Sequence, residues 1–100
     1  MTALDSSDRE ALARLAQRLV WWKNPAEALA DPDRFLAQLM TFGTWNDLQE
    51  ATRFWPEDQF RSALRRAPAG VFDRRSWAYW HHRLDLLPVP PLPTRKLPKN

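Results

Sequence analysis

The chain of 100 residues contains no cysteine and only two glycines. The missing cysteine excludes a disulfide-stapled scaffold, a zinc–cysteine module and a thiol nucleophile. Two glycines are too few for a glycine-rich phosphate-binding loop. Isoleucine is also absent, and valine occurs only at positions 20, 71 and 89. The aliphatic β-branched residues that favour strands are therefore scarce, and we expect no β-sheet.

Long apolar segments are missing as well. The longest apolar run in the helical part, 19–22, has four residues, whereas a membrane-spanning helix needs about 20. Charged residues from Asp5 to Arg18 interrupt the N-terminal region, a pattern that disfavours a secretory signal. The sequence therefore predicts one small soluble cytoplasmic domain without a membrane segment. A chain this short leaves little room for a deep substrate cavity, so a small-molecule substrate is not expected.

What the sequence does contain is a series of amphipathic segments. Apolar residues recur at helical spacing, with Trp22 and Phe42 included in the apolar stripes. These stripes predict helices over 8–22, 32–42, 45–55, 56–67 and 74–84, with one short helical turn at 25–30. Together they predict an all-α fold, a compact bundle of four to five short helices at 1–86 followed by a proline-rich tail at 87–100.

The expected helix ends carry recognisable residues. Ser7 and Glu10 have the spacing of a capping box, in which each side chain bonds the other's free backbone N–H. Asp31, Thr44 and Asp73 are predicted N-caps of later helices. Gly43 follows one helix and is expected to end it in the left-handed conformation.

The C-terminal segment differs in composition, because five of the nine prolines fall between positions 88 and 98. Such a segment favours an extended, polyproline-type conformation. The candidate contact residues are Pro90, Pro91, Pro93 and Arg95, which fit the Pro-x-x-Pro-x-Arg pattern of ligands for SH3-type domains. Two alternatives are favoured over that one: the tail folds back over tryptophans of its own domain, or it occupies a groove of a dedicated partner.

Charge is unevenly distributed along the chain. The net charge is −4 over residues 1–60 and +5 over residues 61–83, where six arginines face Asp73 alone. This asymmetry suggests two different partner surfaces. The planar donor fork of arginine suits phosphate or carboxylate partners.

The segment 56–67 carries the first candidate binding surface. Its side chains away from the apolar stripe are Gln59, Arg61, Ser62, Arg65 and Arg66. With the preceding segment 45–55 it resembles a helix-turn-helix, whose second helix enters the DNA major groove. Arginine pairs with guanine and glutamine with adenine, so these residues are candidate DNA contacts. A solvated arginine-rich face is the alternative, since Trp55 stands where the turn would carry glycine.

The last predicted helix carries the second candidate surface. Trp77, Trp80, His81 and Leu84 share one side, and Arg75, Tyr79 and His82 share the opposite side. With Arg74, the second set is a candidate partner-binding patch, since Tyr and Arg are enriched at interaction hot spots. An ordinary solvent-exposed face is the alternative. His81 and His82 point about 100° apart on a helix and cannot chelate one metal ion well. We expect no metal site, cofactor or catalytic residue.

Several strings of the sequence share a pattern with a known group of proteins. They are 19–22, 35–48 with its Gly43-Thr44-Trp45 junction, Trp55 with 60–64, and 77–80. Over residues 19–84 the chain resembles small bacterial helical proteins encoded beside nucleotidyltransferase-fold toxins of the abortive-infection type. The resemblance implies an antitoxin-like protein that covers its toxin and blocks access of nucleotide or RNA. A helix-turn-helix-like face would add binding to its own promoter.

Two other functions fit the same residues. One is a stand-alone DNA-binding regulator acting through Gln59, Arg61, Arg65 and Arg66. The other is an adaptor that recruits an unrelated protein through its proline-rich tail. None of the three readings requires an enzyme.

Overall fold

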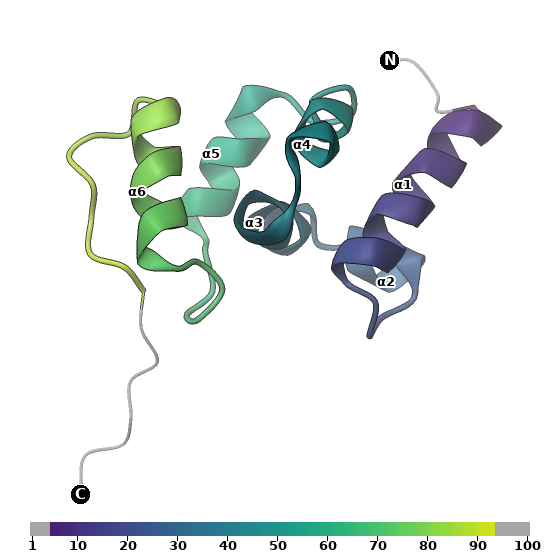
Figure 1. The fold of residues 1–100 in the computed structure, drawn as a ribbon, viewed down its shortest axis with the longest axis horizontal. Helices are drawn as coiled ribbons and strands as arrows, with labels where there is room; N and C mark the ends of the chain where they lie inside the picture. The colour runs from purple at the N-terminus through teal and green to yellow at the C-terminus, as the bar shows by residue number, and fades with distance from the viewer. Residues whose placement is uncertain (1–4, 94–100) are drawn as a thin grey trace, which may run out of the picture.

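The computed structural model describes residues 5–93, and these residues form six α-helices and their connections, with no strand. The helices are α1 (Ser6–Leu19), α2 (Pro25–Leu29), α3 (Pro32–Phe42), α4 (Trp45–Ala51), α5 (Glu57–Arg65) and α6 (Arg74–Arg83). Figure 1 shows α1 and α2 at one end of the molecule, α6 at the other, and α3 between them. The all-α prediction is confirmed. The number of helices is six rather than four to five, because Pro25–Leu29 forms a capped helix of its own.

Helix α3 is the centre of the packing. It contacts all five other helices, and its most extensive contact is with α5. Phe35, Leu36, Ala37 and Leu39 are each no more than 1% exposed. Around them lie the buried faces of α1, α5 and α6, which supply apolar residues such as Leu15, Leu64 and Trp80. The hydrophobic core is therefore organised around one helix whose central apolar residues are almost fully buried.

The beginning of α1 differs from the expected capping box at Ser7 and Glu10. The helix begins at Ser6, and the Asp5 carboxylate caps it by accepting a hydrogen bond from the Asp8 backbone N–H at 2.8 Å. An aspartate one position before the helix satisfies the free N–H groups of the first turn as well as a serine would.

The end of α1 also lies earlier than expected. The helix ends at Leu19, and Val20 leaves the helical conformation with φ −133° and ψ 61°. Trp21 and Trp22 then form part of the turn into α2 and are 76% and 55% exposed. The prediction that Trp22 joins the buried stripe was wrong, because the chain must turn at this point to bring α2 back against α1.

The junction of α3 and α4 corrects a second prediction. Gly43 has φ −73° and ψ 158°, an extended conformation rather than a left-handed one. Glycine is required there by space, because a Cβ atom would lie 2.5 Å from the Leu39 carbonyl oxygen. Phe42, expected on the apolar side of its helix, is 63% exposed.

The N-terminus of α4 is tied to α1 through Asp47. Thr44 and Asp47 form a reciprocal capping box, as the N-cap prediction for Thr44 requires. Asp47 is 5% exposed and also pairs with Arg18 of α1. One carboxylate thus caps a helix and links two parts of the chain that are 29 positions apart.

Helices α4 and α5 are shorter than expected, and Trp55 lies in the turn between them rather than in a helix. Pro56 precedes α5 as its N-cap residue. Each of these helices packs on α3 rather than closely on the other. The helix-turn-helix-like interpretation stays a prediction.

Helix α6 and the segment after it close the other end of the molecule. The face with Trp77, Trp80, His81 and Leu84 is buried, as predicted. Leu86, Val89 and Leu92 pack partly buried against the core, and Trp77 Nε1 donates to the Pro90 carbonyl at 2.7 Å. Residues 84–93 thus run back beside α6 (Figure 1). Arg95 and the rest of the predicted tail, 94–100, lie outside the described residues.

We expect that replacing Asp73 with alanine lowers the free energy of unfolding by about 1 kcal/mol at pH 7, the usual effect of losing an N-cap. Asp73 accepts a hydrogen bond from the Ser76 backbone N–H at 2.7 Å. That bond, with the Ser76 side chain and Arg75, lowers the pKa of Asp73. A carboxyl with a lowered pKa stabilises the fold fully above the unfolded value of about 3.9, and its contribution is lost as pH falls through the folded value.

The measurement is urea unfolding at pH 7 and at pH 3. The difference in free energy of unfolding between the Asp73→Ala variant and the original protein should be smaller at pH 3 than at pH 7. Asp73→Asn is the matched control, because asparagine also caps helices but does not titrate. Equal stability of the alanine variant and the original protein at pH 7 would contradict the prediction.

Candidate protein-binding surface

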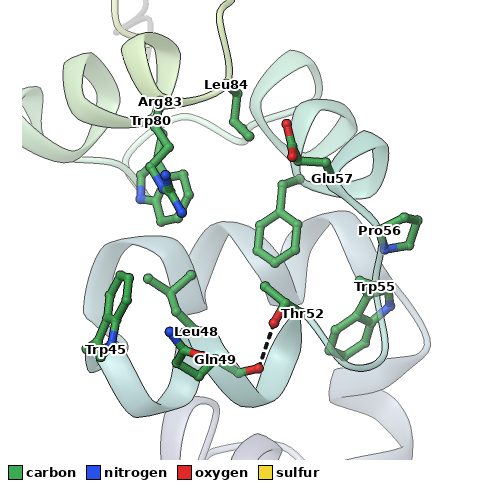
Figure 2. A pocket seen from close by; sticks show the side chains of 11 residues that line it. Trp45, Leu48, Gln49, Thr52, Trp55, Pro56, Glu57, Trp80, Arg83 and Leu84 are labelled. Atoms are coloured by element: carbon green, nitrogen blue, oxygen red, sulfur yellow. Dashed lines mark hydrogen bonds between the residues drawn. The ribbon is translucent and has the colours of Figure 1, made fainter.

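A groove of about 250 Å³ opens between α4, α5 and α6. Its residues on α4 and its C-cap are Trp45, Leu48, Gln49 and Thr52; those on the turn and α5 are Trp55, Pro56, Glu57 and Phe60; and those on α6 and its end are Trp80, Arg83 and Leu84. Figure 2 shows the labelled α4 side chains on one side of the groove and those of α6 on the other. We call this the α4–α6 groove.

The floor of the α4–α6 groove is fixed by specific contacts. Phe60 and Trp80 are 3% and 5% exposed and stack with ring centroids 6.1 Å apart. Trp80 Nε1 donates to the Met40 carbonyl at 2.9 Å, which satisfies its buried N–H and orients its ring. Arg61 Nε donates to the Leu84 carbonyl at 3.1 Å and joins α5 to the end of α6. The groove is therefore a preformed feature of the core surface.

The mouth of the groove is aromatic and cationic. Trp45 stands at its edge and is 60% exposed. Arg83 is exposed on the α6 side, and none of the ion pairs within residues 5–93 involves it. The Glu57 carboxylate already accepts a bond from Arg61 at 2.8 Å. Tyr79, one helical turn before Arg83, is 49% exposed.

The predicted DNA contacts on α5 are largely engaged within the protein. Gln59 and Ser62 donate to the Asp33 carboxylate at 2.7 and 3.0 Å. Arg66 approaches the same carboxylate at 3.5 Å. Asp33 lies on α3, and its side chain is only 13% exposed. Gln59 and Ser62 therefore have a structural role in joining α5 to α3, whereas Arg66 reaches the same carboxylate with a side chain that stays exposed.

The two remaining DNA candidates differ from each other. Arg61 binds the Leu84 carbonyl and also pairs with Glu57 and Asp58. Arg65 is exposed and takes part in none of the ion pairs found in residues 5–93. Among the five candidates, only Arg65 and Arg66 retain guanidinium groups that are accessible to a nucleic acid. Arg66 pairs with Asp33, but its side chain is 77% exposed.

The predicted partner-binding patch on α6 is solvent-exposed. Arg74, Arg75, Tyr79 and His82 are all exposed. Arg75, Tyr79 and His82 lie on the side away from Trp77, whereas Arg74, three positions before Trp77, lies on the same side as that residue. In the proline segment, Pro90 and Pro91 are exposed and Pro93 is half-buried. The patch adjoins the α4–α6 groove, because Arg83 lies one helical turn after Tyr79 and lines that groove.

The residues of the groove itself were missed by the sequence reasoning. On sequence alone, Trp45 is placed at the Gly43-Thr44-Trp45 junction and Trp55 at a turn, and neither is assigned to a binding surface. The available signal was a large apolar side chain, Trp45, at the first position of a helix. Arg83 was counted only in the charge of its segment. Their association depends on how α4 and α6 pack, which no local pattern specifies.

The described part of the chain does not bring metal-ligating side chains together. Residues 5–93 contain no group of three or more His, Cys, Asp and Glu side chains that could hold a metal ion. The buried His81 binds the Trp77 carbonyl through Nδ1 at 2.7 Å, a contact within its own helix. No helix in this range is both long and apolar enough to cross a membrane.

We expect that Asp33→Ala lowers the free energy of unfolding by about 2 kcal/mol, because hydrogen bonds to a charged group contribute about 1.5–3 kcal/mol. The substitution leaves the half-buried Gln59 and Ser62 side chains without their acceptor. Thermal and urea unfolding measure the loss. Arg66→Ala is the matched control, with a loss below about 1 kcal/mol, because its exposed ion pair with Asp33 is screened by solvent. Equal losses in the two variants would reject the proposed role of Asp33.

The geometry therefore presents a preformed groove with an aromatic floor, both polar and apolar lining residues, and an exposed tryptophan and an arginine at its mouth. Comparison with known proteins does not assign a function to this groove. No protein-family model, curated protein or solved structure matches the chain.

Proposed function

We propose that the protein is a non-enzymatic, antitoxin-like binding protein that covers a partner toxin with the surface around the α4–α6 groove. The single observation that carries this proposal is the exposure of Trp45 at the mouth of a groove whose floor is held by the Trp80 hydrogen bond and the Phe60–Trp80 stack. Exposed tryptophan, tyrosine and arginine around a preformed pocket are typical of interaction hot spots.

The size of the groove favours a protein partner over a small molecule. Small-molecule sites measure about 300–1,000 Å³ and bury most of their ligand. The groove measures about 250 Å³, which is below this range. It suits one large side chain projecting from a protein surface, with Trp45 and Tyr79 adding contact area around it.

The antitoxin-like part of the proposal is supported by the resemblance over residues 19–84 and by charge. Nucleotidyltransferase-fold toxins, which the resemblance implies as partners, need acidic residues to bind metal and nucleotide. An arginine-bearing surface is electrostatically complementary to such a site. Covering the site at one-to-one stoichiometry would exclude nucleotide or RNA without any chemical step in this protein.

The alternatives stay predictions of their own. DNA binding through Gln59, Arg61, Ser62, Arg65 and Arg66 requires three of these side chains to leave the Asp33 carboxylate or to bind DNA while held by it. An adaptor role for the tail requires Pro90 and Pro91 to be read while Trp77 holds the Pro90 carbonyl.

The test begins with purification of the tagged full-length protein from its own host, followed by measurement of the mass of the complex. The partner is then expressed alone and together with this protein in a bacterial strain. We expect one partner at fixed stoichiometry that arrests growth alone and is neutralised in co-expression. A partner without toxicity, or nucleic acid in place of a protein, would overturn the proposal.

Trp45→Ala should abolish neutralisation and raise the Kd of the complex at least about 30-fold, because hot-spot side chains contribute about 2 kcal/mol or more. Trp21→Ala is the matched control: Trp21 is more exposed than Trp45, at 76% against 60%, but lies in the α1–α2 turn. We expect its Kd to change less than about threefold. Isothermal titration calorimetry measures both. Equal effects of the two substitutions would remove the groove from the proposal.

A further inference from the structure

We propose that the α4–α6 groove receives a helix of the partner protein, with one bulky apolar side chain between α4 and α6 and a carboxylate one helical turn away on Arg83. This inference rests on the proposed function, since it names what part of the partner occupies the groove. It is carried by the composition of the groove and by the charge on α6.

The residues that line the groove indicate that the partner side chain between α4 and α6 is apolar. Leu48, Trp55, Phe60, Trp80 and Leu84 contribute apolar surface. The Trp80 N–H and the Thr52 hydroxyl already have acceptors, the Met40 and Gln49 carbonyls. The floor thus offers little polar recognition, so the side chain that it accommodates is apolar. Figure 2 shows Leu48 between the aromatic groups, facing the space below Trp80 and Leu84.

A helix is the conformation that fits this lining. An extended peptide lying against the groove needs partners for its backbone N–H and C=O groups. The part of the chain that the structure describes has no strand edge to supply them, and Gln49 is the only amide side chain in the lining. A helix satisfies its backbone internally and presents only side chains, as in helix-in-groove recognition.

The charge of Arg83 indicates that the partner helix carries a carboxylate at this position. Arg83 and Glu57 are the only charged residues in the lining, and Glu57 is paired with Arg61. Of the arginines of α6, Arg83 lines the groove, whereas Arg74 and Arg75 lie at the other end of the helix. Arg83 is therefore the cationic group on the α6 side of the groove, and a carboxylate can form two parallel hydrogen bonds with its guanidinium. On the partner helix, a residue three or four positions from the anchor lies on the same face.

The preformed floor makes this docking energetically favourable. The Trp80 and Arg61 bonds and the Phe60–Trp80 stack hold the groove open in the free protein. Binding then needs little ordering of this chain, so more of the contact energy contributes to affinity.

The first experiment places a photo-crosslinking amino acid at Gln49, on the rim of the groove, in the full-length protein bound to the toxin identified above. The same amino acid at Gln17, an exposed glutamine on α1, is the matched control. We expect position 49 to capture a helical toxin segment with an Asp or Glu three or four residues from a bulky apolar residue. Capture only from position 17, or capture at 49 of a segment that is not helical or has no such acid, would overturn the inference.

The second experiment is a charge exchange across the interface. Arg83→Glu should raise the Kd at least about tenfold, and replacement of the captured carboxylate with lysine should restore most of the affinity to that variant. Arg9→Glu, the same charge change at an exposed site on α1, should alter the Kd less than about threefold. Circular dichroism checks that each variant is folded, and Arg83→Gln, without repulsion at the end of α6, should show a smaller loss in the same direction.

The outcomes separate the two proposals. A toxin complex whose Kd is unchanged by Arg83→Glu and Arg83→Gln rejects the helix-and-carboxylate inference and leaves the proposed function standing. The absence of any protein complex rejects both. Restoration by the reversed pair supports the inference, because a merely structural effect of Arg83 on α6 would not be repaired by a change in the partner.

Discussion

The burial of α3 is the constraint on which the rest of the structure depends. Every other helix packs on it, and Phe35, Leu36, Ala37 and Leu39 are almost fully withdrawn from solvent. A short chain that surrounds one helix can bury only one face of each neighbour. The large aromatic side chains beyond those needed for these faces remain at the surface, at the α1–α2 turn and beside the α4–α6 groove.

Local structure was predictable where it depends on neighbouring residues. Asp31, Thr44 and Asp73 each bond a backbone N–H three positions later, so a sequence window is enough to locate these helix starts. Helix ends were less predictable, because packing decides them. Trp22 continues the apolar spacing of α1, but the chain turns before it. Gly43 has an ordinary extended conformation, and its need for glycine comes from the nearby Leu39 carbonyl.

The candidate site was harder to predict than the fold. Helical periodicity correctly places Gln59, Ser62 and Arg66 off the apolar face of α5, but it does not show that Asp33 lies opposite them. A polar face interpreted as free for DNA is in large part an internal hydrogen-bond network. Conversely, the groove joins residues 45–60 to residues 80–84. Its existence follows from tertiary packing, which a pattern within one helix does not encode.

The two opposite faces of helix α6 have different roles. The face with Trp77 and Trp80 is bound to the Pro90 and Met40 carbonyls and belongs to the core. The first turns of the other five helices each contain an acidic residue, whereas that of α6 contains Arg74 and Arg75. Cations near a helix N-terminus oppose its dipole by about 0.3–1 kcal/mol each. Asp73 offsets part of this cost as the N-cap. Helix α6 therefore retains exposed arginines in its first turn although they oppose its own dipole. This charge makes the solvent-facing side of α6 complementary to an acidic surface.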